Sequence, residues 1–176
     1  LSPRLARGAA LRALCRRQRQ DLSRGLADGF GVASAAWVAA TLEPQVPALR
    51  LALPEMAAAA AARAPEMSAQ GLATTAWAFA VMEVDPLRVA PLLRCLRTEA
   101  LCRLPEFAAQ DLAFTAWAFA SLEVHDAPLM AAISSAAIPK ITHFLPKGLA
   151  NMAWAFALLR IRDRPLMASI AAASVA

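Results

Sequence analysis

The chain of 176 residues has little of what a disordered or a membrane-spanning protein needs. Only 18% of its residues are charged and 59% are apolar, whereas a disordered chain is poor in apolar residues and rich in net charge. Its longest uncharged run, Met67 to Met82, has 16 residues, and a membrane-spanning helix needs about 20. We therefore expect a soluble, folded protein with no transmembrane segment.

Tyrosine is absent, and aromatic residues make up only 6% of the chain. Alanine, in contrast, supplies about a quarter of all residues. Alanine has the highest intrinsic helix propensity, whereas aromatic and β-branched residues favour strands. The composition therefore predicts an all-α protein.

Cysteine and histidine are scarce, which limits the chemistry available to the chain. The cysteines are Cys15, Cys95 and Cys102, an odd number, and the last two would lie about 10 Å apart on one helix, beyond disulfide reach. Neither His125 nor His143 has a Cys, Asp or Ser partner at an interpretable spacing, and no zinc, hydrolase or phosphate-loop motif occurs. We expect free thiols, no metal, no cofactor, no small-molecule substrate and no enzymatic activity.

One phrase occurs four times and contains every tryptophan. Its copies read VASAAWVAATLE, LATTAWAFAVME, LAFTAWAFASLE and LANMAWAFALLR, around Trp37, Trp77, Trp117 and Trp154. The tryptophans are 40, 40 and 37 residues apart, and a second apolar stretch follows each phrase. This periodicity predicts four units of 37–40 residues, at about 29–66, 67–106, 107–143 and 144–176.

Each unit is expected to contain an A helix, which carries the tryptophan, and a B helix, which begins near a proline. The A helices are predicted at 29–43, 68–83, 108–123 and 147–160. The B helices are predicted at 47–62, 86–103, 128–142 and 165–175, and Asp85, Asp126 and Asp163 are suited to cap the last three. Because one helix pair cannot bury its apolar face alone, the units should stack as a right-handed α-solenoid of antiparallel helix pairs.

Positive charge is concentrated at the N-terminal end. Residues 1–50 contain eight arginines against three acids, whereas residues 51–176 contain ten basic and ten acidic residues. Residues 1–28 are expected to hold an Arg-rich helix near 3–20, which could be half of a preceding repeat. The chain starts at Leu1 rather than Met, so we expect a fragment or a processed product.

On a helical wheel, the A helix divides into a sector that the repeats share and a sector that varies. The shared sector is expected to form the core, with Trp77 and Trp117 buried between adjacent units. In the second unit the variable sector contains Gly71, Thr74, Thr75 and Ala78. Either this sector carries binding specificity, or it is merely exposed to solvent and its residues are free to vary between repeats.

An acidic position recurs at the end of the phrase. It is Glu43, Glu83 and Glu123 in the first three units, and Arg160 in the fourth. We expect this position to end the A helix and its glutamates to pair with a B-helix arginine such as Arg94 or Arg97. A catalytic acid would not be expected to recur in three equivalent places.

The fourth phrase, FLPKGLANMAWAFA at residues 144–157, resembles the pattern F-x-P-Q-x-L-A-N-x-x-W-A-x-A of the octotricopeptide repeat. That family is similar to the helical repeats of FAST-kinase-like and RAP-domain proteins. The resemblance covers residues 29–176, although the family's Gln appears only as Gln70 and Gln110 and its Pro-Pro-Pro-Glu-Trp signature is absent. It implies RNA binding in a chloroplast or mitochondrion, in RNA processing, stability or translation.

Under this resemblance, single-stranded RNA would be read by the variable sector, with about one base per repeat. Amide and hydroxyl groups can hydrogen-bond base edges, and an aromatic ring can stack on a base. The candidate residues are Ser34, Gln70, Thr74, Thr75, Gln110, Phe114, Thr115, Lys147 and Asn151. Arg12, Arg16 and Arg19 are candidate phosphate contacts.

The alternative function is a non-catalytic scaffold that binds other proteins, or a structural subunit of a large organelle assembly such as a ribosome. The repeat length allows both functions. The balanced charge after residue 50 favours the scaffold, and the family resemblance favours RNA.

Overall fold

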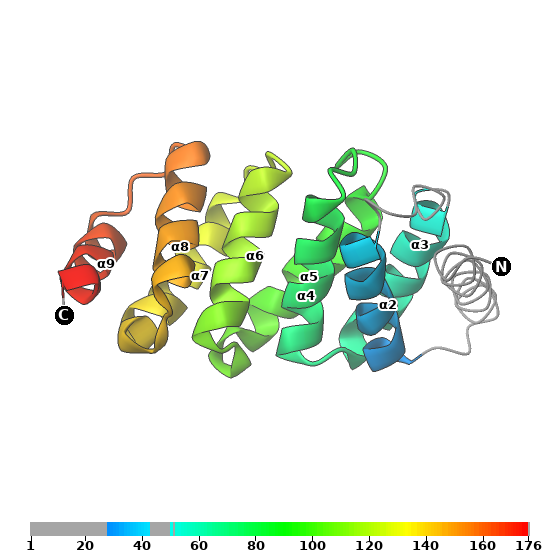
Figure 1. Ribbon diagram of the computed structural model, residues 1–176, viewed down its shortest axis with the longest axis horizontal. Helices are drawn as coiled ribbons and strands as arrows, with labels where there is room; N and C mark the ends of the chain where they lie inside the picture. Colours follow the sequence, from blue (N-terminus) through cyan, green and yellow to red (C-terminus); the bar gives the residue numbers. More distant parts are fainter. Residues whose placement is uncertain (1–27, 43–49, 51, 176) are drawn as a thin grey trace, which may run out of the picture.

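The computed structural model describes residues 28–42, 50 and 52–175, and within these ranges it contains only helices and no strand (Figure 1). The A helices are α2 (Gly29–Leu42), α4 (Ala69–Val81), α6 (Ala109–Ser121) and α8 (Pro146–Leu158). The B helices are α3 (Leu53–Arg63), α5 (Ala90–Arg103), α7 (Ala127–Ala137) and α9 (Arg164–Val175). The all-α prediction is confirmed for these ranges, while the expected helix at 3–20, with Cys15, Arg12, Arg16 and Arg19, lies outside them.

Short 3-10 helices lead from three of the B helices to the next A helix. They are η2 (Ala64–Glu66), η3 (Leu104–Glu106) and η4 (Ile138–His143), and each has a proline at its second residue. No helix in the described part of the chain is long and apolar enough to cross a membrane.

Aspartates cap two of the B helices as predicted. Leu129 N–H donates to Asp126 Oδ1 at the start of α7, and Leu166 N–H donates to Asp163 Oδ1 at the start of α9, both at 3.0 Å. The third case differs, because Asp85 Oδ1 accepts from Leu87 N–H at 2.9 Å within a separate turn. Helix α5 therefore begins at Ala90 rather than at residue 86.

The A helices lie side by side in one row, and the B helices form a second row behind them (Figure 1). We call these the A row (α2, α4, α6, α8) and the B row (α3, α5, α7, α9). Alanines at the contacts between A helices, such as Ala76 and Ala116, are at most 1% exposed and let the helices approach closely. Phe79, Phe119 and Phe156 are equally buried and fill the core.

Each of the last three A helices ends in the same backbone motif. Glu83, Glu123 and Arg160 have φ values of 50°, 55° and 56°, in the left-handed region. In the second unit, Glu83 N–H bonds Ala80 O and Val84 N–H bonds Phe79 O, at 3.0 and 3.3 Å, which is the Schellman pattern. This position therefore ends the A helix in the last three units, as predicted, while Glu43 of the first unit lies outside the described residues.

The predicted ion pairs of the same glutamates are wrong. Arg97 instead bonds the Asp126 carboxylate at the start of α7, so it links neighbouring B helices. No ion pair joins Glu83 or Glu123 to Arg94 in the part of the chain that the structure describes.

Two basic side chains join the end of their repeat unit to its beginning by hydrogen bonds. Arg103, at the end of α5, donates to Met67 O at 2.6 Å. In the next unit, Lys140 donates to Phe107 O, and Met67 and Phe107 hold equivalent positions just before their A helices. The end of each of these units is thereby tied to its beginning.

Candidate nucleic-acid interface on the A row

In α2, α4 and α6 one narrow stripe is open to solvent, because neighbouring helices cover the rest, whereas α8 also exposes Ala150 and Ala157. In α4 this stripe is Gln70, Thr74, Trp77 and Val81, whose spacing keeps them within about 60° on a helical wheel. The equivalent residues are Phe30, Ser34, Trp37 and Thr41 in α2, Gln110, Phe114, Trp117 and Ser121 in α6, and Lys147, Asn151, Trp154 and Leu158 in α8.

The tryptophans belong to this stripe, and Trp77 and Trp117 pack against the edge of the core without being buried in it, so the expectation that they are buried is wrong. Both are only partly buried, and Trp37 and Trp154 are 48% and 44% exposed. On the wheel, tryptophan stands at the edge of the shared sector, and neighbouring helices cover that edge only in part. The spacing of four, three and four residues along the stripe is a sequence signal that identifies this column.

Thr75 and Thr115 are buried, which corrects the expectation that they face a ligand. They are 0% and 3% exposed. Thr115 Oγ1 donates to Asp111 O at 2.8 Å, and Thr75 Oγ1 lies 3.7 Å from Met67 Sδ. On a helical wheel they lie opposite the shared sector, but the inner helices α4 and α6 have an A helix on either side and the B row behind them, so these threonines cannot reach a ligand.

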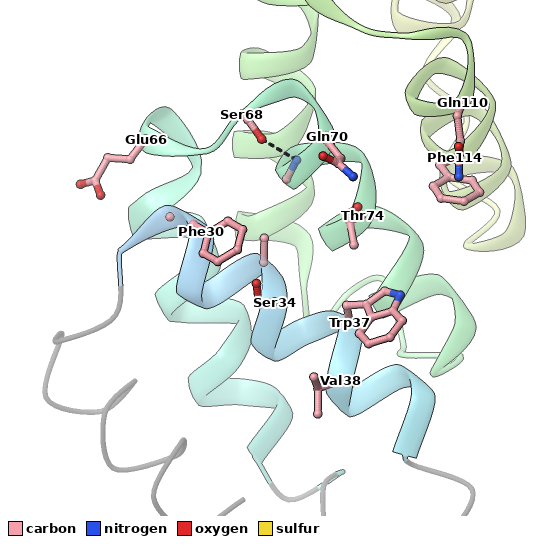
Figure 2. A pocket seen from close by; sticks show the side chains of 13 residues that line it. Phe30, Ser34, Trp37, Val38, Glu66, Ser68, Gln70, Thr74, Gln110 and Phe114 are labelled. Carbon is pink, nitrogen blue, oxygen red and sulfur yellow. Dashed lines mark hydrogen bonds between the residues drawn. The ribbon is translucent and has the colours of Figure 1, made fainter. Parts of the chain in front are cut away.

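The other seven candidate residues of the A helices line one groove. A cavity of about 740 Å³ lies over α2, α4 and α6 (Figure 2), and a second of about 390 Å³ lies between α6 and α8. Gln110 and Phe114 line both cavities, so the two adjoin, and we call them together the A-row groove. The candidates that line it are Ser34, Gln70, Thr74, Gln110, Phe114, Lys147 and Asn151.

The beginning of each A helix shapes the floor of the groove. Ser68 caps α4, where its Oγ accepts from Gly71 N–H at 3.1 Å (Figure 2). Ala108 cannot do this in α6, and Asp111 reaches back instead to accept from Ala108 N–H at 3.0 Å. Burial raises the pKa of the Asp111 carboxyl, although this hydrogen bond and the charge of Lys140 oppose the shift.

Aromatic rings of neighbouring units pair along the stripe. Trp77 stacks with Phe114, with ring centroids 5.9 Å apart and planes 27° from parallel. Trp117 stacks with Trp154 at 6.2 Å and 28°. Phe114 stands where the other units have Ser34, Thr74 or Asn151, and it therefore divides the groove into its two cavities.

The groove has few charges. Among the described residues that line it, Glu66 and Lys147 are the only ones of the types Asp, Glu, Lys and Arg. The described residues also contain no cluster of three or more His, Cys, Asp or Glu side chains that could hold a metal, and Cys95 and Cys102 are free thiols. Such a lining suits an uncharged ligand group with hydrogen-bonding edges and a flat apolar face.

No protein-family model and no curated protein sequence matches this chain. Function must therefore be inferred from the repeated unit and from the groove that it builds. The A-row groove is the feature in which most of the candidate residues of the A helices meet.

Proposed function

We propose that the chain is an α-solenoid of octotricopeptide-like hairpins, and that it binds single-stranded RNA along the A-row groove. The observation that carries this proposal is the groove itself. It crosses four equivalent helices, and each contributes one residue of the same column, namely Ser34, Thr74, Phe114 and Asn151.

The chemistry of the groove fits unpaired bases. Hydroxyl and amide groups donate to and accept from base edges, and exposed rings offer apolar faces on which bases stack. A duplex hides these edges and faces within its own stack, whereas a single strand can turn its bases outward. With about one base per unit, four units contact about four nucleotides.

Phosphate contacts contribute little within the groove. Lys147 is the only lysine or arginine among the described residues that line it, so binding there depends weakly on salt. Arg12, Arg16 and Arg19 supply the salt-sensitive part of the affinity in this proposal. The octotricopeptide resemblance extends the proposal to a chloroplast or mitochondrial protein that acts in RNA processing, stability or translation.

The low charge of the groove also favours a second candidate, a scaffold that binds a protein segment. Phe30 and Leu145 line the groove and are 81% and 70% exposed, so an apolar peptide side chain would gain free energy by covering them. In this function the chain would be a structural part of a larger assembly.

Fluorescence polarisation with labelled RNA tests the proposal. A folded sample should bind a single-stranded RNA of mixed sequence at low salt and bind the matching duplex more weakly. The variant Thr74→Ala/Asn151→Ala loses two hydrogen-bonding side chains, worth about 0.5–1.5 kcal/mol each, so its affinity should fall about fivefold to a hundredfold.

The matched control is Thr98→Ala/Ser135→Ala, which removes two exposed hydroxyls from the B row. Its RNA affinity should equal that of the unchanged protein. Absence of RNA binding by the folded protein at low salt contradicts the proposal and supports the scaffold.

A further inference from the structure

In both stacked ring pairs of the A row, the second ring belongs to the next A helix and follows the first by 37 residues along the chain. The pairs are Trp77 with Phe114 and Trp117 with Trp154. The residue at the same distance after Trp37 is Thr74, which has no ring. The side of Trp37 that faces α4 therefore lacks the aromatic cover that the next two tryptophans receive.

The space beside Trp37 on this side is open. It belongs to the larger cavity of the groove, about 740 Å³, which Trp37, Gln70 and Thr74 line together. In Figure 2 the Trp37 ring projects from α2 below Thr74 of α4. Trp37 is also the only tryptophan among the described residues that line either cavity. In the next unit the ring of Phe114 covers Trp77, so the cavity leaves room for a flat ring in the corresponding place.

Hydrogen-bonding groups around this space have no protein partner. Hydroxyls elsewhere in the described helices donate to the carbonyl one turn back, as serine and threonine commonly do inside helices. Examples are Thr41, Thr98, Thr115 and Ser135. Within the described residues, the hydroxyls of Ser34 and Thr74 and the side-chain amide of Gln70 make no hydrogen bond. A ring with donors and acceptors along its edge would give these groups partners.

We infer that one base of the bound strand stacks on Trp37, in the place that Phe114 takes beside Trp77 one unit further on. This inference rests on the proposed RNA binding and deepens it, because it names the tryptophan that meets a base. A nucleobase fits better than an aromatic peptide side chain, since its edge carries the donors and acceptors that a phenyl ring lacks. Thr74 is then a specificity-determining residue, because its small side chain leaves the indole open.

The first test closes the space. Thr74→Phe supplies the ring that α4 lacks, so it should stack on Trp37 and exclude the base. Fluorescence polarisation with a labelled single-stranded RNA of about eight nucleotides should show an affinity at least about fivefold lower, which is about 1 kcal/mol at about 1.4 kcal/mol per tenfold change. The matched control is Thr98→Phe, the same substitution at an exposed threonine of α5 outside the groove, and its RNA affinity should be unchanged.

The second test moves the open ring by one unit. In the double variant Thr74→Phe/Phe114→Thr, Trp37 is covered and Trp77 is uncovered. If ring cover decides where the base stacks, this variant should regain most of the affinity that Thr74→Phe loses. A folded double variant that binds RNA no better than Thr74→Phe would overturn the inference, and circular dichroism identifies any variant that fails to fold.

The third test leaves the cavity unfilled and therefore holds even if Thr74→Phe does not fold. Trp37→Leu removes the aromatic face from an exposed position and should weaken RNA binding at least about fivefold, whereas Trp37→Phe keeps a face and should retain most of the affinity. Because the chain has no tyrosine, tryptophan fluorescence gives a second readout. RNA should quench the unchanged protein, and Trp37→Phe should lose most of this quenching, since Trp77, Trp117 and Trp154 line neither cavity.

The failure of this inference differs from that of the proposed function. If RNA binds the unchanged protein, and a folded Thr74→Phe or Trp37→Leu variant binds it equally well, the proposed function stands and the stacking inference is overturned. If Trp37→Phe keeps the full quenching, the inference is likewise overturned, because another tryptophan would be the one in contact. If no RNA binds to the folded, unchanged protein, the proposed function fails and the inference fails with it.

Discussion

The A row and the B row come from the same repeated unit, yet they bury very different fractions of their helices. In α6, nine of 13 residues are buried, whereas in the preceding B helix, α5, four of 14 are. An inner A helix has helices on both sides and the B row behind it, while the outer surface of a B helix faces solvent. The same length of helix therefore tolerates far fewer changes in the A row.

This difference also explains why the groove lies on the A row. Alanines at the helix contacts bring the A helices close together, so only a narrow stripe of larger side chains stands above the surface. Residues of that stripe are held by a closely packed layer and lie in register from unit to unit. Binding residues on such a layer are positioned with little conformational freedom.

The largest expected effect comes from removing a core ring of the A row. Phe119 is 1% exposed, and Phe119→Ala should lower the free energy of unfolding by about 3–5 kcal/mol. Leu101, which is only partly buried on α5, provides the B-row comparison, and Leu101→Ala should cost about 1–2 kcal/mol. Urea unfolding followed by circular dichroism measures both, and equal losses would contradict the contrast between the rows.

Adding a larger side chain should also destabilise the A row more than the B row, although the difference in the free energy of unfolding should be smaller. Ala116 is fully buried on α6, and Ala116→Leu should destabilise the protein by about 1–3 kcal/mol. Ala131 is exposed on α7, so Ala131→Leu should change stability by no more than about 0.5 kcal/mol. Thermal unfolding of the pair checks this, and a tolerated leucine at residue 116 would show that the A helices are not in close contact there.

Glycine should have opposite effects at the end of an A helix and inside a B helix. Glu123 has a φ of 55°, which glycine adopts without steric cost, so Glu123→Gly should stabilise the protein by about 1 kcal/mol. Glu99 lies within α5, and Glu99→Gly should destabilise it by about 1 kcal/mol. Urea midpoints of the two variants should move in opposite directions, and a shift in the same direction would refute the prediction.

The smallest effects concern two carboxylates, that of Glu106 in η3 and that of Asp111 in the first turn of α6. Burial raises the pKa of Asp111, so its contribution to stability is present at low pH and is lost as pH rises through the folded-state pKa. The Arg103 guanidinium lowers the pKa of Glu106, so that contribution is present above the unfolded-state pKa and is lost as pH falls through the folded-state value.

Asp111→Asn and Glu106→Gln should therefore have opposite effects on how the stability of the protein changes with pH in the acidic range. Relative to the unchanged protein, Asp111→Asn should gain stability as pH rises, because Asn keeps the hydrogen bond without a buried charge. Glu106→Gln should lose relative stability over the same rise. Thermal melts between about pH 3 and pH 7 measure both slopes, and parallel slopes would contradict the assigned environments.

The sequence by itself determined the repeated unit and the existence of its helices. Alanine-rich composition, the tryptophan period and the aspartates before the prolines are local signals, because helix propensity and capping depend on near neighbours along the chain. The position that ends each A helix was identifiable for the same reason. Asp85 was the exception, since its cap belongs to a turn that precedes α5.

Only the tertiary structure decided which side of the A helix stays open. A helical wheel orders residues by angle, but it does not show which arcs the neighbouring helices cover. That coverage buried Thr75 and Thr115, and it left Trp37 and Trp154 far more exposed than a core position allows. The groove, the ring pairs and the difference between inner and outer tryptophans all arise from contacts between units about 40 residues apart, which no local sequence pattern specifies.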